Sequence, residues 1–515
     1  MELSHAAEIS KDKPFDTTVA SHDIQEGSFA EKQKYDRKNV DDALAIYDLD
    51  VSPGDVEAVD LRRLVWKIDL RLMPIMFFAT TLFTMDKATL SYSSIMGLRR
   101  DTHLTCDEYA WVGSVFSLGY LAANLPCAVI IQRLPLSKWI VVTMSIWGVI
   151  LACTAAAKYY SQLVAIRVLL GIFEASITPV FVLMTGMWYT PSEQAIRLGL
   201  WYSGLGMATL IGSPIAYAIT GREKIGVLSS WQFLYVIFGV ITVVVAIVFL
   251  FVVPDSQLSA RFLTPAERVA AVERIRVNQQ GIGNRHFKWY QAREVLLDPR
   301  TYLYFAVQLV YNIGFGAVST FSSLLLVSLG FDNRQALIYT MPHGATTIVA
   351  MLLFCVLAAK MNDRTLWAGL SCLGGAVAGL CLYGLNDSKH AALAAFYFQH
   401  ICTPAYILSF SLVSVNTAGH TKKVLTNAVL LLGSTSGTLT GPQVTKNDPS
   451  YTKVKLVMWL CPLISLVLFA AILVLNIYEN RQRDKRGSEH VIDREFLDQT
   501  DRENPEFRYL LRWVV

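Results

Sequence analysis

Residues 231–253, WQFLYVIFGVITVVVAIVFLFVV, form an apolar run that contains no charged side chain. The hydrocarbon core of a bilayer is about 30 Å thick, so a helix that spans it needs ~20 apolar residues. The charged segment 254–300 follows this run directly. Counting this run, six apolar runs precede that segment and six follow it. Since backbone polar groups in lipid must be satisfied within their own segment, each run is predicted to be a helix.

The sequence thus predicts an all-α integral membrane protein with twelve transmembrane helices in two pseudo-symmetric six-helix halves. The predicted spans are 70–91, 109–131, 138–157, 163–186, 198–220 and 231–253, then 301–329, 335–359, 365–385, 391–415, 424–444 and 454–478. The predicted domains are a cytosolic N-terminal tail (1–69), the first half (70–253), a cytosolic central loop (254–300), the second half (301–478) and a cytosolic C-terminal tail (479–515). Both tails are expected to be largely flexible. Two sets of six spans are typical of secondary transporters.

Composition excludes several other classes of protein. The chain is 53% hydrophobic and 17% charged with a mean hydropathy of +0.40, which is unlike a soluble domain. A net charge of +4 gives no reason to expect a nucleic-acid partner. The eight cysteines lie almost all in apolar runs without a CxxC pair, so neither disulfides nor a zinc site are expected. HExxH, GxxxxGK[ST] and GxSxG motifs are absent, so we expect neither an enzyme nor a cofactor.

Basic residues beside the spans predict the orientation. An even number of spans places both ends on one side of the membrane. Lys and Arg are enriched in cytoplasmic loops, and local clusters next to the spans therefore favour cytosolic termini. These clusters are Arg62, Arg63, Lys67 and Arg71; Lys422 and Lys423; and Arg481, Arg483, Lys485 and Arg486. We expect the plasma membrane as the location and a monomer as the state of the protein.

The two halves share a short repeat. Residues 178–183, TPVFVL, match residues 403–408, TPAYIL, at an offset of 225. The same offset relates Arg197 to Lys422, each just before the next span. Chance could produce so short a match, but the shared offset, span number and basic residue favour duplication. Transporters built from parallel repeats hold their substrate between the halves, near the bilayer midplane.

Longer motifs carry a resemblance to a known family. They are DKATLSY (86–92), MGL (96–98), QRLPLSKW (132–139), RVLLGIFEAS (167–176), MWY (187–189), NQQGIGN (278–284), FKWYQ (287–291), AGHTKK (418–423), GPQ (441–443) and ENPEFR (503–508). With them the chain resembles the major facilitator superfamily, and within it the fungal allantoate permease-like group of anion:cation symporters. The resemblance covers about residues 66–508.

This resemblance implies proton-coupled uptake of a small organic solute, often a carboxylate or a vitamin, across a fungal membrane. It does not name the substrate, because similar scaffolds carry different molecules. Two departures from the family pattern affect the expectation. The loop signature after the second span is reduced to Gln132, Arg133 and Lys138, and Asn124 stands where relatives often carry a glutamate.

Charged residues in the fourth span are the first candidates for a site. A charge at a helix centre costs about 2.5–3.5 kcal/mol on insertion scales, so such residues usually face a cavity or a partner. Arg167 and Glu174 are seven residues apart and share one helical face with Gly171. Arg167 could bind a substrate carboxylate, and Glu174 could take up the accompanying proton. Alternatively, Arg167 reaches the outer surface and Glu174 is a strut between helices.

Asp86 and Lys87 in the first span are the second pair of candidates. Adjacent residues on a helix point about 100° apart, so the two side chains address different neighbours. One could pair across helices while the other faces the cavity. We assign Asp86 to proton coupling and Lys87 to substrate binding, although a structural ion pair explains these residues equally well.

Uncharged candidates lie in both halves. Gln308 and Asn312 in the seventh span could offer hydrogen bonds to a substrate, and Tyr92 and Tyr406 could stack on it. Packing between helices explains each of them equally or better. His343 and His400 could titrate near neutral pH, but a lone histidine in the membrane is more often a packing residue.

Three functional classes remain open. The first is a proton-coupled importer of a small carboxylate, with protons and the lipid bilayer as its other partners. The second is an exporter of a fungal metabolite with the same architecture. The third, a nutrient sensor that does not transport, is disfavoured because the tails are short and contain no recognisable signalling domain.

In the central loop, residues 264–267 (TPAE) predict the capped start of a short helix. This helix either lies on lipid headgroups or forms a solvated linker.

Overall fold

The structure is a computed structural model. It describes residues 52–131, 134–220, 224–257, 259–276, 288–361, 363–385, 388–446, 448, 450–486, 500–504 and 507–509. All of these belong to one compact unit, which comprises Val51–Gln280 and His286–Val515. A second unit, Met1–Asp50 with Gly281–Arg285, lies outside the described residues.

Helices occupy every predicted span of the first half. Prolines and glycines within several spans divide them into shorter helices. The elements are α2 (Pro53–Glu57), α3 (Leu61–Ile95), α4 (Leu98–Asp101), α5 (Cys106–Ile131), α6 (Leu136–Cys153), η3 (Thr154–Ala156), α7 (Tyr160–Glu174), α8 (Ile177–Trp188), α9 (Pro191–Tyr202), α10 (Gly204–Ile219) and α11 (Ser230–Val252). Two antiparallel strands, β1 (Lys224–Ile225) and β2 (Leu228–Ser229), join α10 to α11.

Helices also occupy every predicted span of the second half, which follows the two helices of the central loop. These are α12 (Pro265–Arg276) and α13 (Trp289–Leu297). The second half comprises α14 (Pro299–Ser328), α15 (Asn333–Tyr339), α16 (Met341–Met361), α17 (Arg364–Gly384), α18 (Lys389–Phe398), η4 (Gln399–Cys402), α19 (Pro404–Asn416), α20 (His420–Thr445) and α21 (Thr452–Arg486). The predicted all-α class is thereby confirmed. Helices α3 and α21 extend well beyond the predicted spans 70–91 and 454–478.

Within the part of the chain that the structure describes, nine helical segments are long and apolar enough to cross a membrane. The other three predicted spans, 109–131, 198–220 and 424–444, coincide with α5, α9–α10 and α20. These helices contain several Gly, Ser, Thr and Asn residues. The same small and polar residues allow helices to pack closely.

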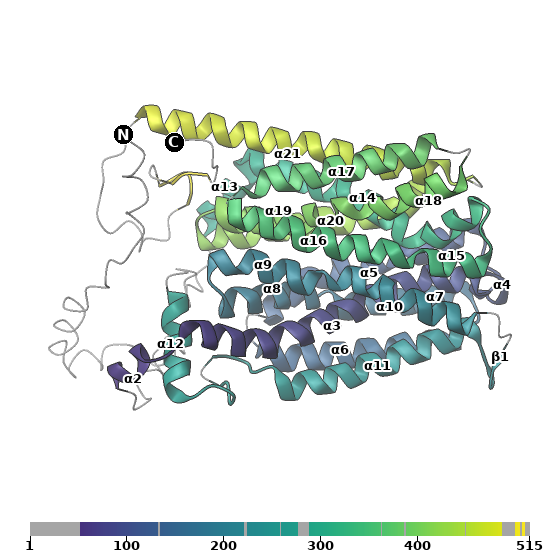
Figure 1. Ribbon diagram of the computed structural model, residues 1–515, viewed down its shortest axis with the longest axis horizontal. Helices are drawn as coiled ribbons and strands as arrows, with labels where there is room; N and C mark the ends of the chain where they lie inside the picture. Colours follow the sequence, from purple (N-terminus) through teal and green to yellow (C-terminus); the bar gives the residue numbers. More distant parts are fainter. Residues whose placement is uncertain are drawn as a thin grey trace, which may run out of the picture. The chain divides into compact units, whose positions relative to one another are not determined.

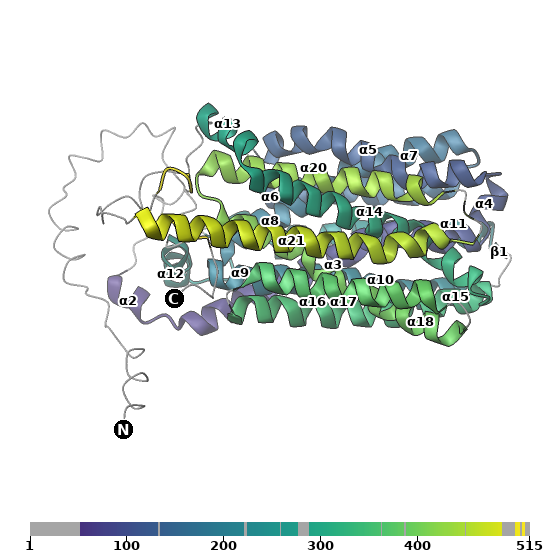
Figure 2. The same ribbon diagram turned by 90° about the horizontal axis from the view of Figure 1, so that it is seen from above.

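The helices run roughly alongside one another (Figures 1 and 2). In Figure 1 the second-half helices α14–α21 lie above the first-half helices α3–α11. The largest contacts between the halves join α10 to α16, α5 to α20, and α9 to α16. Helices α2 and α12 lie at one end of the helices, which we call the tail end, and β1 and α4 lie at the other.

Glycines bring α14 and α20 together. Gly433, Gly437 and Gly441 recur every fourth residue, so they lie on one face of α20. A Cβ added at Gly437 would lie 2.3 Å from the carbonyl oxygen of Leu309, and one at Gly441 would lie 2.4 Å from that of Ile313. No larger residue fits without moving the helices apart. This is the small-xxx-small pattern by which membrane helices approach closely.

At the tail end, Lys422 joins three acidic residues. Its Nζ lies 2.7 Å from Asp501 Oδ1, 2.8 Å from Glu294 Oε1 and 3.0 Å from Asp298 Oδ2. Burial alone would favour the neutral acid, but the charges of Lys422 and Arg300 hold the pKa of Asp298 below its ordinary value. The cluster connects α13, α14 and α20 to the segment after α21.

The described residues of that segment, 500–504 and 507–509, are packed, although the sequence suggested a largely flexible tail. Asp501 and Tyr509 are each 1% exposed. Tyr509 Oη donates to Asp501 Oδ2 at 2.7 Å and accepts from Arg300 at 2.9 Å. Arg483 on α21 donates to the carbonyl of Phe507 at 2.7 Å. These buried polar contacts fix the segment because unpaired charges would be costly there.

The first half has a related contact. Arg197 binds Asp69 at 2.9 Å, so both basic residues of the predicted repeat hold a carboxylate. The offset of 225 that relates Arg197 to Lys422 also relates Asp69 to Glu294. This agreement supports a duplicated origin for the tail-end contacts.

Helix α12 packs against the first half. The predicted capped start is confirmed, since Thr264 N–H donates to Glu267 and the Glu267 N–H donates back to Thr264 Oγ1. Ala270 and Ala271 are buried, and Arg274 binds Glu193 at 2.9 Å. The helix therefore contacts protein, whereas the sequence suggested lipid headgroups or a solvated linker.

Candidate functional site

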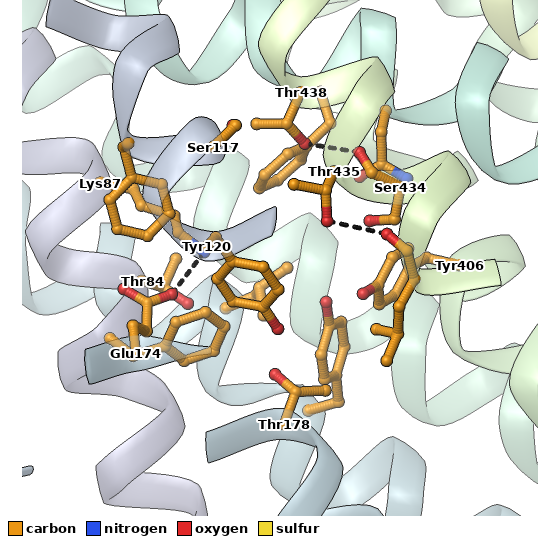
Figure 3. Close-up of a pocket in the computed structure, with 17 residues that line it drawn as sticks. Thr84, Lys87, Ser117, Tyr120, Glu174, Thr178, Tyr406, Ser434, Thr435 and Thr438 are labelled. Atoms are coloured by element: carbon orange, nitrogen blue, oxygen red, sulfur yellow. Dashed lines mark hydrogen bonds and ion pairs between the residues drawn. The ribbon is translucent and has the colours of Figure 1, made fainter. Parts of the chain in front are cut away.

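A cavity lies between the two halves (Figure 3). Helices α3, α5, α7, α8, α9 and α10 line it from one side, and α14, α19 and α20 from the other. The lining residues are Phe83, Thr84, Lys87, Phe116, Ser117, Tyr120, Glu174, Thr178, Tyr202, Leu205, Asn312, Phe315, Tyr406, Leu431, Ser434, Thr435 and Thr438.

An ion pair forms part of the cavity wall. Lys87 Nζ on α3 lies 2.8 Å from Glu174 Oε1 on α7. The Glu174 side chain is 1% exposed, whereas that of Lys87 is 21% exposed. The ammonium also lies over the rings of Phe83, at 4.3 Å, and Phe116, at 5.3 Å. Aromatic faces attract a cation, so the two rings help to hold the ammonium at the cavity wall beside Glu174.

A second ion pair lies behind this wall. Arg167 Nη1 lies 3.3 Å from Asp86 Oδ1, and the two side chains are 3% and 0% exposed. Trp147 Nε1 donates to Asp86 Oδ2 at 3.2 Å, and Arg167 Nη2 donates to Tyr235 Oη at 2.9 Å. This network joins α3, α6, α7 and α11 within the first half. None of its members is among the residues that line the cavity.

The two candidates on α3 thus address different neighbours, as their angular separation predicted. Lys87 faces the cavity, and Asp86 pairs across helices. Glu174 and Arg167 lie on one helix but bind these two different partners. Glu174 lines the cavity as expected, whereas Arg167 is placed behind it.

Prolines interrupt the fourth and tenth spans beside the cavity. Pro179 has no N–H to donate to the carbonyl of Ala175, and α7 ends at Glu174. Pro404, its counterpart in the repeat, begins α19 after the short 3₁₀ helix η4. The offset of 225 relates Glu174 to Gln399. Both halves therefore contain an equivalent helix interruption beside the cavity.

Close packing of α5 on α7 holds Glu174 at this position. A Cβ added at Gly171 would lie 2.1 Å from the carbonyl oxygen of Phe116, and one at Gly119 would lie 2.1 Å from that of Val168. Only glycine permits this approach. It brings the cavity-lining residues of α5 next to Glu174.

The uncharged candidates are divided between the wall and its support. Asn312 and Tyr406 line the cavity. Gln308 is buried behind them, where it donates to Ser409 Oγ at 2.5 Å and accepts from Asn312 at 3.0 Å. Tyr92 lines a neighbouring cavity, and its Oη lies 3.1 Å from Ser213 Oγ. His343 and His400 also line that neighbouring cavity.

Most of the remaining polar wall consists of hydroxyl groups that the sequence did not single out. They belong to Thr84, Ser117, Tyr120, Thr178, Tyr202, Ser434, Thr435 and Thr438. Figure 3 shows Lys87 and Glu174 on one side, Tyr406 and Thr435 on the other, and the Tyr120 side chain between them. Tyr202 stacks on Tyr406 with ring centres 5.3 Å apart, which joins the two halves at the cavity.

The cavity has a simple electrostatic character. Among its lining residues within the described part of the chain, Lys87 and Glu174 alone carry charge. A carboxylate could bind Lys87 if Glu174 became neutral, while hydroxyl and amide groups held the rest of the molecule. Within the same part of the chain, no cluster of three or more His, Cys, Asp or Glu is placed to hold a metal ion.

Comparisons with known proteins agree with this architecture. The sequence profile of the Major Facilitator Superfamily matches residues 76–442. Among solved structures, a bacterial homologue of the human lysosomal transporter Spinster, in an inward-facing and unoccupied conformation, has a TM-score of 0.58 at 15% identity. That match covers 80% of this chain and 96% of the other. At such low identity, the likeness concerns the fold alone.

Several fungal proteins are similar over nearly their whole length. An uncharacterized transporter of Schizosaccharomyces pombe is 37% identical, covering 91% of this chain and 93% of its own. Allantoate permease of Saccharomyces cerevisiae is 35% identical, covering 93% and 91%. A thiamine pathway transporter of the same yeast is 30% identical, covering 86% and 85%.

Proposed function

Because the chain belongs to the Major Facilitator Superfamily, and within it to the fungal transporters that include allantoate permease, we propose that it takes up a small organic anion together with protons. The chain is a secondary transporter and not an enzyme. The observation that carries the finer proposal is the Lys87–Glu174 pair on the wall of the central cavity. The substrate class is a small carboxylate, bound during alternating access of the cavity to the two sides.

Competition for Lys87 couples the proton to the anion. An ammonium in the membrane interior needs a negative partner, because an unpaired charge there is costly. Glu174 supplies that partner when the cavity is empty. A proton on Glu174 removes its charge and frees Lys87 for the carboxylate of a substrate. The state with both proton and anion therefore keeps one negative charge beside Lys87, as the empty state does.

The roles predicted for Asp86 in proton coupling and for Arg167 in substrate binding stay predictions. Their burial supports a positioning role instead. The pair fixes the rotation of α3 against α7, and this rotation determines where Lys87 points. Tyr92, Gln308, Asn312 and Tyr406 remain proposed contacts or supports of the substrate.

Import across the plasma membrane with cytosolic termini completes the proposal. The basic clusters of the sequence adjoin the start of α3, the start of α20 and the end of α21, which lie at the tail end. The enrichment of Lys and Arg in cytoplasmic segments supports a cytosolic tail end.

Uptake by cells that express the chain tests the proposal. A panel of labelled small carboxylates and vitamins is offered in acidic and in neutral medium, with surface expression verified. We expect one compound to accumulate, more strongly in acid, and to lose this accumulation in Glu174→Gln. Glu57→Gln, at an exposed residue of α2, is the matched control and should behave as wild type.

Accumulation that persists in Glu174→Gln would refute this coupling mechanism. If no compound enters surface-expressing cells, efflux from preloaded cells is measured next. Efflux that depends on the chain would replace import by export.

A further inference from the structure

A second cavity adjoins the central one. The two share Thr84, Lys87, Leu205 and Phe315 as lining residues, so they meet at the ammonium of Lys87. We call this second cavity the histidine lobe. A ligand whose carboxylate binds Lys87 can extend from there into the lobe.

Two imidazole rings contact each other in this lobe. His343 comes from α16 and His400 from η4, and their ring centres are 3.8 Å apart. His343 also stacks on Phe396, with ring centres 4.9 Å apart and planes inclined by 17°. This aromatic contact fixes the plane of the His343 ring. His400 is positioned at the helix interruption before Pro404, where Thr403 Oγ1 lies 3.4 Å from its Nδ1.

One imidazole nitrogen lacks a hydrogen-bond partner. His343 is 6% exposed, and among the described residues nothing bonds to its Nε2. A buried polar atom left without a partner is unfavourable, because it has lost its hydrogen bond to water. Since His343 lines the lobe, a polar group of a ligand can supply the missing bond.

The charges around the lobe restrict that group. Lys87 is its only lysine, arginine, aspartate or glutamate among the described lining residues, and Tyr92 is the remaining titratable neighbour of the histidines there. A second carboxylate would find no second permanent cation, and an ammonium would be repelled by Lys87. Two imidazolium charges at this spacing would also repel each other, so at most one of the two rings carries a charge. Neutral imidazole both donates and accepts hydrogen bonds, as amides and hydroxyls do.

We propose that the histidine lobe binds an uncharged polar group at the far end of the substrate, with His343 and His400 as its specificity-determining residues. The substrate class is then a monocarboxylate with a distal amide or hydroxyl group. This inference rests on the proposed function, because Lys87 must hold the carboxylate.

Matched ligands test the lobe without knowledge of the natural substrate. The probes are succinamate, glutaramate and adipamate, each compared with the alkanoate of the same chain length: butyrate, pentanoate and hexanoate. Succinate adds a distal carboxylate, and 4-aminobutyrate adds a distal ammonium. Affinities are measured on the purified full chain by tryptophan fluorescence and by the rise in melting temperature.

We expect at least one amide to bind roughly tenfold more tightly than its alkanoate, as one additional hydrogen bond to a buried group would give. The dianion and the ammonium should gain nothing over butyrate. His343→Leu and His400→Leu should each reduce the amide preference toward one, where the preference is the ratio of amide to alkanoate affinity measured on the same variant. His343→Gln, which keeps a hydrogen-bonding group, should retain part of the preference. His390→Leu, at an exposed histidine of α18, is the control.

Equal affinities of amides and alkanoates for the wild type, or a preference that survives in the folded His343 and His400 variants, would overturn the histidine lobe. The melting temperature of the ligand-free protein identifies variants that do not fold, and for these the glutamine variant decides.

Lys87→Met separates the proposed carboxylate site from the proposed histidine lobe. If probes bind the wild type and this variant equally, or bind neither, the proposed carboxylate site fails. If binding depends on Lys87 but the preference for amides over alkanoates does not depend on the histidines, only the proposal of the histidine lobe fails.

Discussion

Two ion pairs begin at neighbouring residues of α3 and end in different surroundings. Asp86 binds Arg167 in a network whose side chains are at most 3% exposed. Lys87 binds Glu174 on the cavity wall and stays 21% exposed. The chemistry of the pairs is the same, and a rotation of about 100° along the helix separates them. The comparison teaches that the surroundings of an ion pair decide whether a substrate can replace one of its members. A pair on a cavity wall permits this replacement, whereas a pair enclosed by protein does not.

The largest expected effect comes from breaking the enclosed pair. Arg167→Met leaves Asp86 charged and buried, so the folded protein should lose about 3–5 kcal/mol. We expect little protein in the membrane and a much lower melting temperature in detergent. Asp86→Asn combined with Arg167→Met should recover most of this loss, because no unpaired charge remains. A single variant as stable as wild type would contradict the distinction between the pairs.

Breaking the pair on the cavity wall should affect transport more than stability. In Lys87→Met, Glu174 lies on the cavity wall, unlike Asp86, and can take up a proton there and become neutral, so the chain should still fold. Substrate affinity should fall roughly 10- to 100-fold, since a hydrogen bond to a charged group contributes ~1.5–3 kcal/mol. Uptake kinetics and melting temperature measured on the same preparation check both parts. A collapse of stability with unchanged affinity in the remaining folded protein would reverse the assignment.

The position of Glu174 depends on the glycine contact between α5 and α7. The Cβ of Gly171→Ala would meet the carbonyl of Phe116 at 2.1 Å and push the helices apart. We expect a loss of about 1–3 kcal/mol, typical of overpacking, together with weaker uptake. Gly384→Ala is the control, because no atom lies within 4 Å of the added Cβ. Equal melting temperatures for both variants would show that the contact is less strict than described.

The smallest effect concerns an ion cluster outside the membrane. The pKa of Asp298 lies below its ordinary value despite burial, because Lys422 and Arg300 stabilise its charge. The stability it contributes is therefore present above the ordinary carboxyl pKa of about 4 and is lost as the pH falls through and below that value. Melting temperatures from pH 7 to pH 3 should decline less in Asp298→Asn than in wild type. Parallel curves would contradict this contribution.

Much of the fold could be predicted because apolar runs and charge clusters are local features of the sequence. The divergence of Asp86 and Lys87 followed from helix geometry alone. The place of Arg167 did not, because it lies on the same face of its helix as Glu174 and only packing decides which neighbour each one meets.

The hydroxyl-rich wall could not be predicted, since Ser, Thr and Tyr are common in membrane helices. The glycines at 433, 437 and 441 were an available signal for the close packing of α20. The pairing of His343 with His400 had no signal at all, because two lone histidines in different spans give no indication of a contact.

The ion pair between Lys422 and Asp501 has a consequence for the order in which the tail end forms during synthesis of the chain. Asp501 leaves the ribosome 79 residues after Lys422 (501 − 422), which takes roughly 4–16 s at ~5–20 residues per second. During that interval, Glu294 and Asp298 are the acidic partners of Lys422 among the described residues. The second half therefore completes its tail end only after α21 has been synthesised. A chain interrupted before Asp501 would present an unfinished cluster to the quality-control proteases of the cell.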